Sequence, residues 1–179
     1  GKFLYPGFID AHAHFFGYGL DLRKANLTGT ENWEDVLHHL SDFAKDLNPK
    51  PGEWIIGRGW DQNDWQIKEY PTKEKLDQLF PNNPVILTRV DGHAAIVNQL
   101  ALDKSGVTAS TKLIGGDVIL KGGKPTGVLI DNAVDLVSAN IPPATDQQIK
   151  EGLIAAQQNC FAVGLTTIDD CGLSYENVL

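Results

Sequence analysis

Several features that would place this sequence in a familiar class are missing from it. No apolar run approaches the roughly 18 residues that a membrane-spanning helix needs, so we expect neither a membrane protein nor a membrane partner. The 15 Lys and Arg residues are outnumbered by 23 Asp and Glu residues, which gives a net charge of −8. Because no basic stripe is present to contact phosphates, we expect no nucleic-acid partner either.

Cysteine and methionine are also scarce. Cys160 and Cys171 form no CxxC pattern and follow no signal peptide, so a reduced, cytoplasmic setting is expected. The chain has no methionine, begins with Gly1 and stops at Leu179, soon after what reads as a strand and its loop. Since a natural chain normally starts with an initiator residue or a signal, we expect a fragment of a longer protein.

What is present is an alternation of strand-like and helix-like segments, which predicts an α/β fold. Strands are predicted over residues 7–15, 54–60, 85–90 and 165–169, with a hairpin over 117–130 that turns at Gly122-Gly123. Helices are predicted over residues 31–47, 72–80, 94–104 and 146–163. Two capping boxes are predicted, Thr28 with Glu31 and Thr145 with Gln148.

The sharpest chemical signal is His12-Ala13-His14 at the end of the first predicted strand. Residues two apart on a strand point to the same side with Cα atoms about 6.5 Å apart, so two imidazoles can converge on one metal ion. Asp10 falls on the same face and could orient a ligand. The alternative is that the pattern arises by chance and the histidines are ordinary polar residues.

The surrounding residues favour the metal interpretation. The stretch from Pro6 to His14 resembles the opening signature PGxxDxHxH of the amidohydrolase superfamily. Further blocks resemble its amidohydrolase-3 group, which includes N-substituted formamide deformylases, D-aminoacylase relatives and so-called exoenzyme regulatory proteins. These blocks are residues 59–65, 89–95, 125–129 and 164–167. One departure is Asp169-Asp170, where a His-Asp pair is expected, so no histidine function carries over there.

The resemblance implies a (β/α)8 TIM barrel whose first strand ends in two metal-binding histidines, here His12 and His14. It implies hydrolysis of amide or related C–N bonds in a small molecule by a metal-activated water, with Zn²⁺ as the expected ion. In the superfamily the remaining ligands and the catalytic acid come from later strands, beyond Leu179. The fragment alone is therefore expected to be inactive, because a catalytic zinc usually has three protein ligands.

Other polar residues are candidates for substrate binding or for support of the metal ligands. Asp91-Gly92-His93 follows a strongly apolar strand, although the alternative is a plain turn in which Asp91 caps the next helix. Arg89 could bind a carboxylate, or form a surface ion pair. A pocket wall is predicted from Trp60, Asp61, Asn63 and Trp65, and strand-end acids from Asp169 and Asp170.

About 150 residues separate His14 from the strand at Thr166-Thr167, more than a simple βα unit needs. We therefore expect residues 1–49 and 141–179 to belong to an incomplete barrel, and residues 50–140 to form an inserted α/β subdomain. The strands at 54–60 and 85–91 could instead belong to the barrel. Unpaired strand edges lead us to expect a homo-oligomer or a rearranged edge. Two functional alternatives stay open: an inactive barrel with a regulatory or binding function, and a hydrolase of lactones or phosphoesters.

Overall fold

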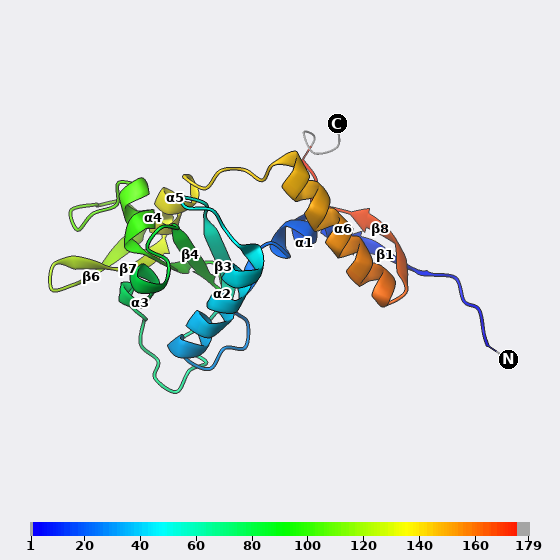
Figure 1. Ribbon diagram of the computed structural model, residues 1–179, viewed down its shortest axis with the longest axis horizontal. Helices are drawn as coiled ribbons and strands as arrows, with labels where there is room; N and C mark the ends of the chain where they lie inside the picture. The colour runs from blue at the N-terminus through cyan, green and yellow to red at the C-terminus, as the bar shows by residue number, and fades with distance from the viewer. Residues whose placement is uncertain (1, 175–179) are drawn as a thin grey trace. The chain divides into compact units, whose positions relative to one another are not determined.

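The computed structural model describes residues 2–174 and shows the predicted α/β architecture (Figure 1). The chain divides into two compact units, one formed by Gly1–Arg23 with Pro143–Leu179 and the other by Lys24–Pro142. The boundary predicted after residue 49 therefore lies elsewhere, because the helix over 33–47 packs with the larger unit. Within residues 2–174 no helix is long and apolar enough to cross a bilayer.

The larger unit is built on a six-stranded sheet in the order β2-β3-β4-β5-β7-β6. The first three strands pair in parallel, and the last three join in antiparallel fashion. The strands are β2 (Ala25–Asn26), β3 (Ile55–Trp60), β4 (Val85–Arg89), β5 (Ala94–Val97), β6 (Gly116–Lys121) and β7 (Lys124–Asp131).

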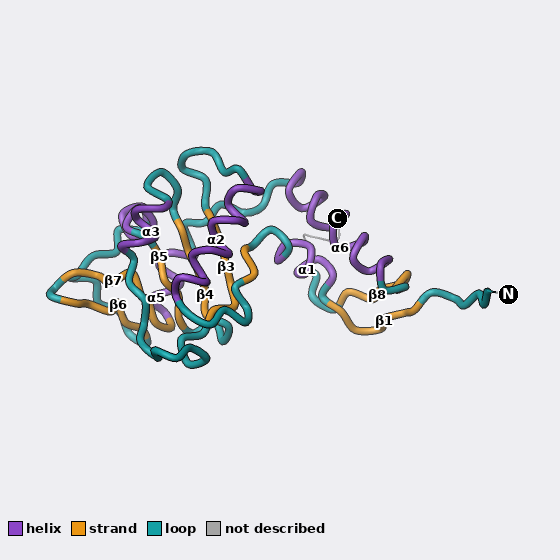
Figure 2. Tube along the Cα trace, turned by 60° about the horizontal axis from the view of Figure 1, so that its bottom comes forward, coloured by secondary structure: helices purple, strands orange, loops and turns teal. Residues whose placement is uncertain are grey.

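Both faces of this sheet are covered, because neighbouring residues on one strand enter different cores (Figure 2). Leu87 packs in the core that includes α2, whereas Ile86 packs in the core that includes α4 and α5. Such double burial explains why β4 reads as a continuous apolar run. The helices are α2 (Trp33–Leu47), α3 (Glu74–Leu79), α4 (Gln99–Lys104) and α5 (Asn132–Ser138).

The helix predicted over residues 94–104 is wrong in its first half. Ala94–Val97 form β5, which pairs with β4 and β7 and is fully buried. Helix α4 starts only after Asn98, whose side chain accepts hydrogen bonds from the backbone N–H groups of Ala101 and Val85. Pairing with two strands therefore overrides the local helical pattern.

The two predicted capping boxes have different outcomes. Thr145 and Gln148 cap helix α6 (Asp146–Ala162) reciprocally, as predicted. Helix α2 instead starts after Asn32, whose side chain accepts from the Asp35 backbone N–H at 2.9 Å, so the Thr28 and Glu31 box is wrong. The hairpin turn at Gly122-Gly123 is confirmed by the pairing of β6 with β7.

The smaller unit contains β1 (Phe8–Ala13), α1 (Phe15–Asp21), α6 and β8 (Leu165–Asp170). β1 and β8 form a two-stranded parallel sheet although they lie at opposite ends of the chain (Figure 1). The first strand is shorter than predicted, since Phe15 already begins α1. Helices α1 and α6 touch at Gly19 and Gly152, where an added Cβ on Gly152 would lie 2.4 Å from the Gly19 carbonyl oxygen.

Candidate metal centre

The two histidines of the HxH motif lie together at the carboxyl end of β1. His12 is in the strand, and His14 occupies the position that precedes helix α1. Their ring centroids are 5.8 Å apart, with the ring planes at 85°. Both residues are exposed, so their imidazoles are open to a shared ligand. The two rings therefore lie near each other even though β1 ends at Ala13 and His14 is no longer in extended conformation.

Asp10 does not contact either imidazole through a recorded hydrogen bond among the described residues. Its carboxylate Oδ1 accepts from the backbone N–H of His12 at 3.0 Å. This bond closes a short loop within the strand and fixes the backbone from which His12 projects. Asp10 therefore supports His12 through the main chain.

Asp170, at the carboxyl end of β8, is the acid that the fold brings beside His14. In the parallel pairing of β1 with β8, Ala13 stands opposite Asp170. The Asp170 carboxylate accepts from the backbone N–H groups of Phe16 and Gly172, each at 2.7 Å. These two bonds, with the nearby His14, lower the pKa of Asp170 below its ordinary value.

Sequence reasoning named Asp169 and Asp170 together as strand-end acids, and the structure distinguishes them. Asp169 is exposed, and its described contact is a backbone carbonyl that accepts from the Cys171 thiol. Strand periodicity places neighbouring residues on opposite faces, but only the register with β1 decides which of the two faces His14. The close approach of this segment is visible at Gly172, where an added Cβ would lie 2.5 Å from His14 Nδ1.

The residues at this strand end fit part of a divalent-metal site. Imidazole nitrogen is a preferred ligand of zinc and of related first-row ions, and a pair of imidazoles is available here. Within residues 2–174 no group of three or more His, Cys, Asp and Glu side chains is placed to hold an ion. His12 and His14 thus provide an incomplete ligand set that needs further groups.

Arg89 and Asp91, predicted to face a substrate, are engaged with each other. Arg89 donates from Nε and Nη2 to the two carboxylate oxygens of Asp91, at 3.0 and 2.7 Å. Its Nη1 donates to the Tyr70 hydroxyl at 3.1 Å. These hydrogen bonds raise the pKa of Arg89 and lower the pKa of Asp91. The two nitrogens with which Arg89 could bind a substrate carboxylate, Nε and Nη2, are therefore already bonded to Asp91.

His93 is held at the tip of the turn between β4 and β5. Its backbone N–H donates to Asp91 Oδ1 at 3.0 Å, and its ring Nδ1 lies 2.9 Å from Asp131 Oδ1. The turn interpretation of Asp91-Gly92 is confirmed, since Gly92 has φ +80°. The expected cap on a following helix is wrong, because a strand follows. Asp131 was missed, as nothing in the sequence shows that β7 ends beside this turn.

The predicted pocket wall is not formed by its aromatic residues. Trp60 is fully buried, and its indole N–H donates to the Leu87 carbonyl at 2.8 Å. Trp65 is also buried and donates to the Thr30 carbonyl. Asp61 accepts from the backbone and side chain of the neighbouring Asn63. These residues therefore stabilise a core and its adjoining loop.

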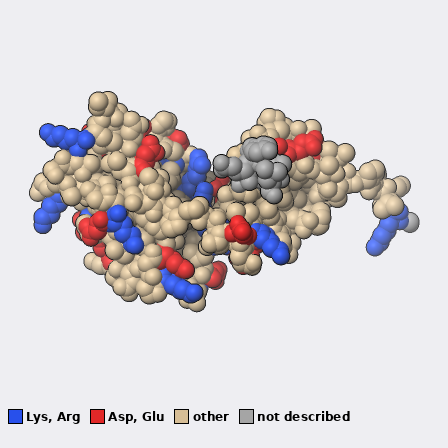
Figure 3. Space-filling model, turned by 90° about the horizontal axis from the view of Figure 1, so that it is seen from above, with Lys and Arg blue, Asp and Glu red and all other residues tan. Residues whose placement is uncertain are grey.

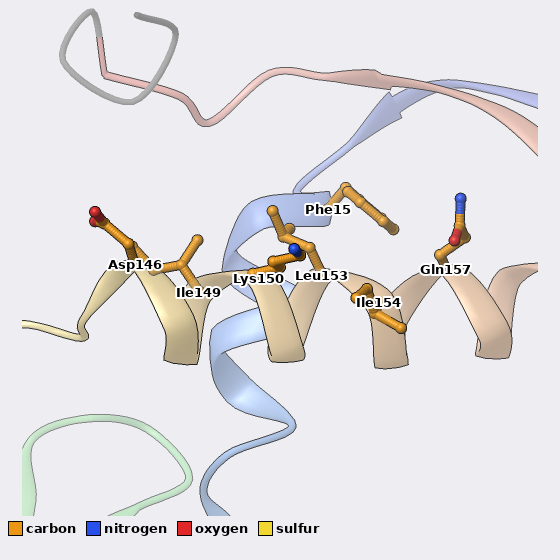
Figure 4. Close-up of a pocket in the computed structure, with 7 residues that line it drawn as sticks. All are labelled: Phe15, Asp146, Ile149, Lys150, Leu153, Ile154 and Gln157. Carbon is orange, nitrogen blue, oxygen red and sulfur yellow. The ribbon is translucent and has the colours of Figure 1, made fainter.

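A groove of about 420 Å³ lies instead along helix α6 (Figure 4). Its wall is mainly apolar, with Asp146 at one end, Gln157 at the other and Lys150 between them. His12 and His14 do not line it. The groove therefore shares no candidate metal ligand. Its lining residues are Phe15, Asp146, Ile149, Lys150, Leu153, Ile154 and Gln157.

Comparison with models of known protein families shows which family the chain belongs to. The profile of the family described as "Amidohydrolase family" matches residues 1–179, the whole sequence. The chain belongs to the amidohydrolase family. This finding confirms the resemblance drawn from the HxH motif and the blocks that follow it. The family implies a divalent metal and hydrolase chemistry, consistent with paired imidazoles at a strand end.

Three curated relatives cover nearly all of this amidohydrolase chain. The Bacillus subtilis protein YtcJ, whose name assigns it to the amidohydrolases, is 37% identical over 98% of the chain. LONG AFTER FAR-RED 3 of Arabidopsis thaliana is 36% identical over 96%. The N-substituted formamide deformylase of Arthrobacter pascens is 32% identical over 95%. The chain spans only 33%, 29% and 32% of these relatives, about a third of their length.

Solved structures confirm the fold. Metal-dependent hydrolases from Pyrococcus furiosus and Pyrococcus horikoshii, both uncharacterised, each match with a TM-score of 0.63 and 24% identity. The match covers 91% of this chain and 31% or 30% of the solved chains. The arrangement described above is thus one found in larger hydrolases.

Proposed function

We propose that this chain is the N-terminal part of a metal-dependent amidohydrolase that hydrolyses amide or related C–N bonds of a small molecule. The observation that carries the proposal is the pair of exposed imidazoles of His12 and His14 at the end of β1, in a chain of the amidohydrolase family. In this proposal, the remaining metal ligands and the catalytic acid come from residues that are not among the 179 of this sequence.

In the same proposal β1 and β8 are strands of a (β/α)8 barrel, and residues 24–142 form the inserted subdomain. The parallel pairing of β1 with β8 supports this, since all strands of such a barrel are parallel. The proposed metal site then lies at the carboxyl ends of the strands, where barrel enzymes place their active sites. A homo-oligomer and a reduced cytoplasmic setting remain predictions from the sequence.

Each residue at the strand end has a definite task in this account. His12 and His14 hold the metal, for which we propose Zn²⁺, and Asp10 fixes the backbone of His12. Asp170 stays ionised beside His14, held by the N–H groups of Phe16 and Gly172. When bound, the metal supplies Lewis-acid polarisation of the scissile carbonyl and acidifies a water near neutral pH. His93 is proposed to contact the substrate.

The test is hydrolysis of a panel of N-formyl and N-acyl amides by the full-length protein. We expect turnover that a chelator abolishes and added Zn²⁺ restores. His12→Ala should reduce turnover by about 100-fold or more, the scale seen when one charge-stabilising group is lost. His39→Ala is the matched control, since His39 is also exposed but pairs with Asp35 on helix α2.

Other results of the same assay would favour one of the two alternative functions. Turnover of lactones or phosphoesters, without any amide hydrolysis, would keep the metal site but contradict the C–N bond class. A folded protein that hydrolyses none of these substrates, with or without Zn²⁺, would contradict the enzyme and favour a barrel with a binding function.

A further inference from the structure

The first turn of helix α1 is capped by a side chain from a different element. His14 stands immediately before this helix, at the position whose side chain ordinarily accepts a hydrogen bond from the second or third helical N–H group. The His14 side chain makes no such bond. The Asp170 carboxylate, at the end of β8, accepts from the Phe16 N–H at 2.7 Å in its place. The imidazole of His14 is therefore not needed to cap the helix.

The main chain around His14 is held by hydrogen bonds on both sides. Before it, the Cys171 N–H donates to the Ala13 carbonyl at 2.9 Å, beside the paired strands β1 and β8. After it, the Tyr18 N–H donates to the His14 carbonyl at 2.8 Å, within the first turn of α1. The point from which the imidazole projects therefore depends on β8 and on α1 together.

The ring of His14 is restricted by Gly172. A Cβ added to Gly172 would lie 2.5 Å from His14 Nδ1, so a larger residue there would collide with the ring. Gly172 is not among the glycines with positive φ, so the space beside the ring, and not the backbone conformation, calls for glycine. The Gly172 N–H donates to Asp170 Oδ1 at 2.7 Å. The carboxylate that caps α1 therefore also holds this backbone against the ring.

We propose that Asp170 is a positioning residue, whose two oxygens hold the first turn of α1 and the backbone of Gly172 so that the imidazole of His14 is oriented for the metal. The proposal rests on the hydrolase function proposed above, in which His14 is a metal ligand. It adds a residue that acts on this ligand through the main chain. Removing a group that orients a metal ligand typically lowers metal affinity about 10–100-fold.

The first test measures the position of the ring in metal-free, full-length protein, by NMR with ¹³C-labelled histidine and glycine. In the wild type we expect a nuclear Overhauser effect between His14 Hε1 and the Hα protons of Gly172. Asp170→Asn keeps one of the two acceptor oxygens, so this effect should be lost and the Phe16 N–H should exchange faster with solvent. Asp146→Asn, an exposed carboxylate in the first turn of α6, is the control and should retain the effect. A ring contact that persists in Asp170→Asn would overturn the proposal.

The second test measures zinc affinity by competition with a chelator. Asp170→Asn should bind Zn²⁺ about 10-fold more weakly than wild type, or worse, whereas Asp146→Asn should bind it equally well. Gly172→Ala should also weaken binding, because its Cβ displaces the His14 ring while the charge of Asp170 is kept.

Two results of the zinc titration would contradict the positioning. Affinity that is unchanged in both Asp170→Asn and Gly172→Ala would overturn the proposal. Affinity that falls only in Asp170→Asn would overturn it too, because the carboxylate would then act through its charge. If the wild-type protein binds no zinc, the proposed function fails, whereas the ring contact in the metal-free protein still decides the positioning of His14.

Discussion

At the scale of single residues, candidate ligand groups divide into those left open and those committed within the chain. His12, His14 and His93 are exposed, whereas Arg89 and Asp91 satisfy each other. For His12 and His14, the period of two along a strand predicted that the two side chains lie together. An ion pair of Arg89 was one of its two predicted outcomes, but its partner Asp91 could not be predicted, because the pairing depends on local geometry. The approach of Asp170 to His14 could not be predicted either, because it depends on strand register.

Asp91 should make stability depend on pH in a defined direction. Its pKa is lowered in the folded state, so its contribution is complete above the ordinary carboxyl value of about 3.9 and is lost as the pH falls below it. At pH 7, Asp91→Asn should cost about 0.2–1 kcal/mol, the range for a solvent-screened pair. By pH 3 the gap between variant and wild type in a thermal melt should have narrowed markedly. An undiminished gap would contradict this assignment.

At the scale of elements, helices α2 and α6 and strands β3 and β4 were predicted correctly, because their apolar patterns agree with their packing. The error at residues 94–104 shows the limit, since four apolar residues suit a strand or a helix and only their partners decide. Trp60 is a similar case, because a polar turn follows it in the sequence whereas in space it packs in a buried core.

Contact between helices α1 and α6 depends on Gly152. An alanine there would place its Cβ against the Gly19 carbonyl, so Gly152→Ala should destabilise the protein by about 1–3 kcal/mol despite the better helix propensity of alanine. Gly17→Ala is the matched control, since its Cβ meets only the His14 Cβ at 3.9 Å. Chemical denaturation measures both. Equal stability of the two variants would contradict the close helix contact.

At the scale of the whole molecule, the α/β fold class predicted from the sequence is confirmed, whereas the insertion between two barrel strands stays a prediction. The parallel pairing of β1 with β8 agrees with the expectation that both segments belong to one incomplete barrel, whereas its register follows from the structure alone, since no local pattern indicates it. The division at residues 24 and 142 also needed the structure, because α2 joins the larger unit through buried contacts. On the face drawn in Figure 3, basic side chains lie scattered among acidic ones, in keeping with the absence of a basic stripe from the sequence.

The central claim is that His12 and His14 bind a metal ion. Its most direct test is the metal content of the full-length protein, prepared without chelator and measured by mass spectrometry. We predict one or two divalent ions per chain in the wild type and their loss in the His12→Ala/His14→Ala variant. The His38→Ala/His39→Ala variant, which removes another adjacent histidine pair, should retain them. Folded wild-type protein that holds no metal even after Zn²⁺ is supplied would contradict the account.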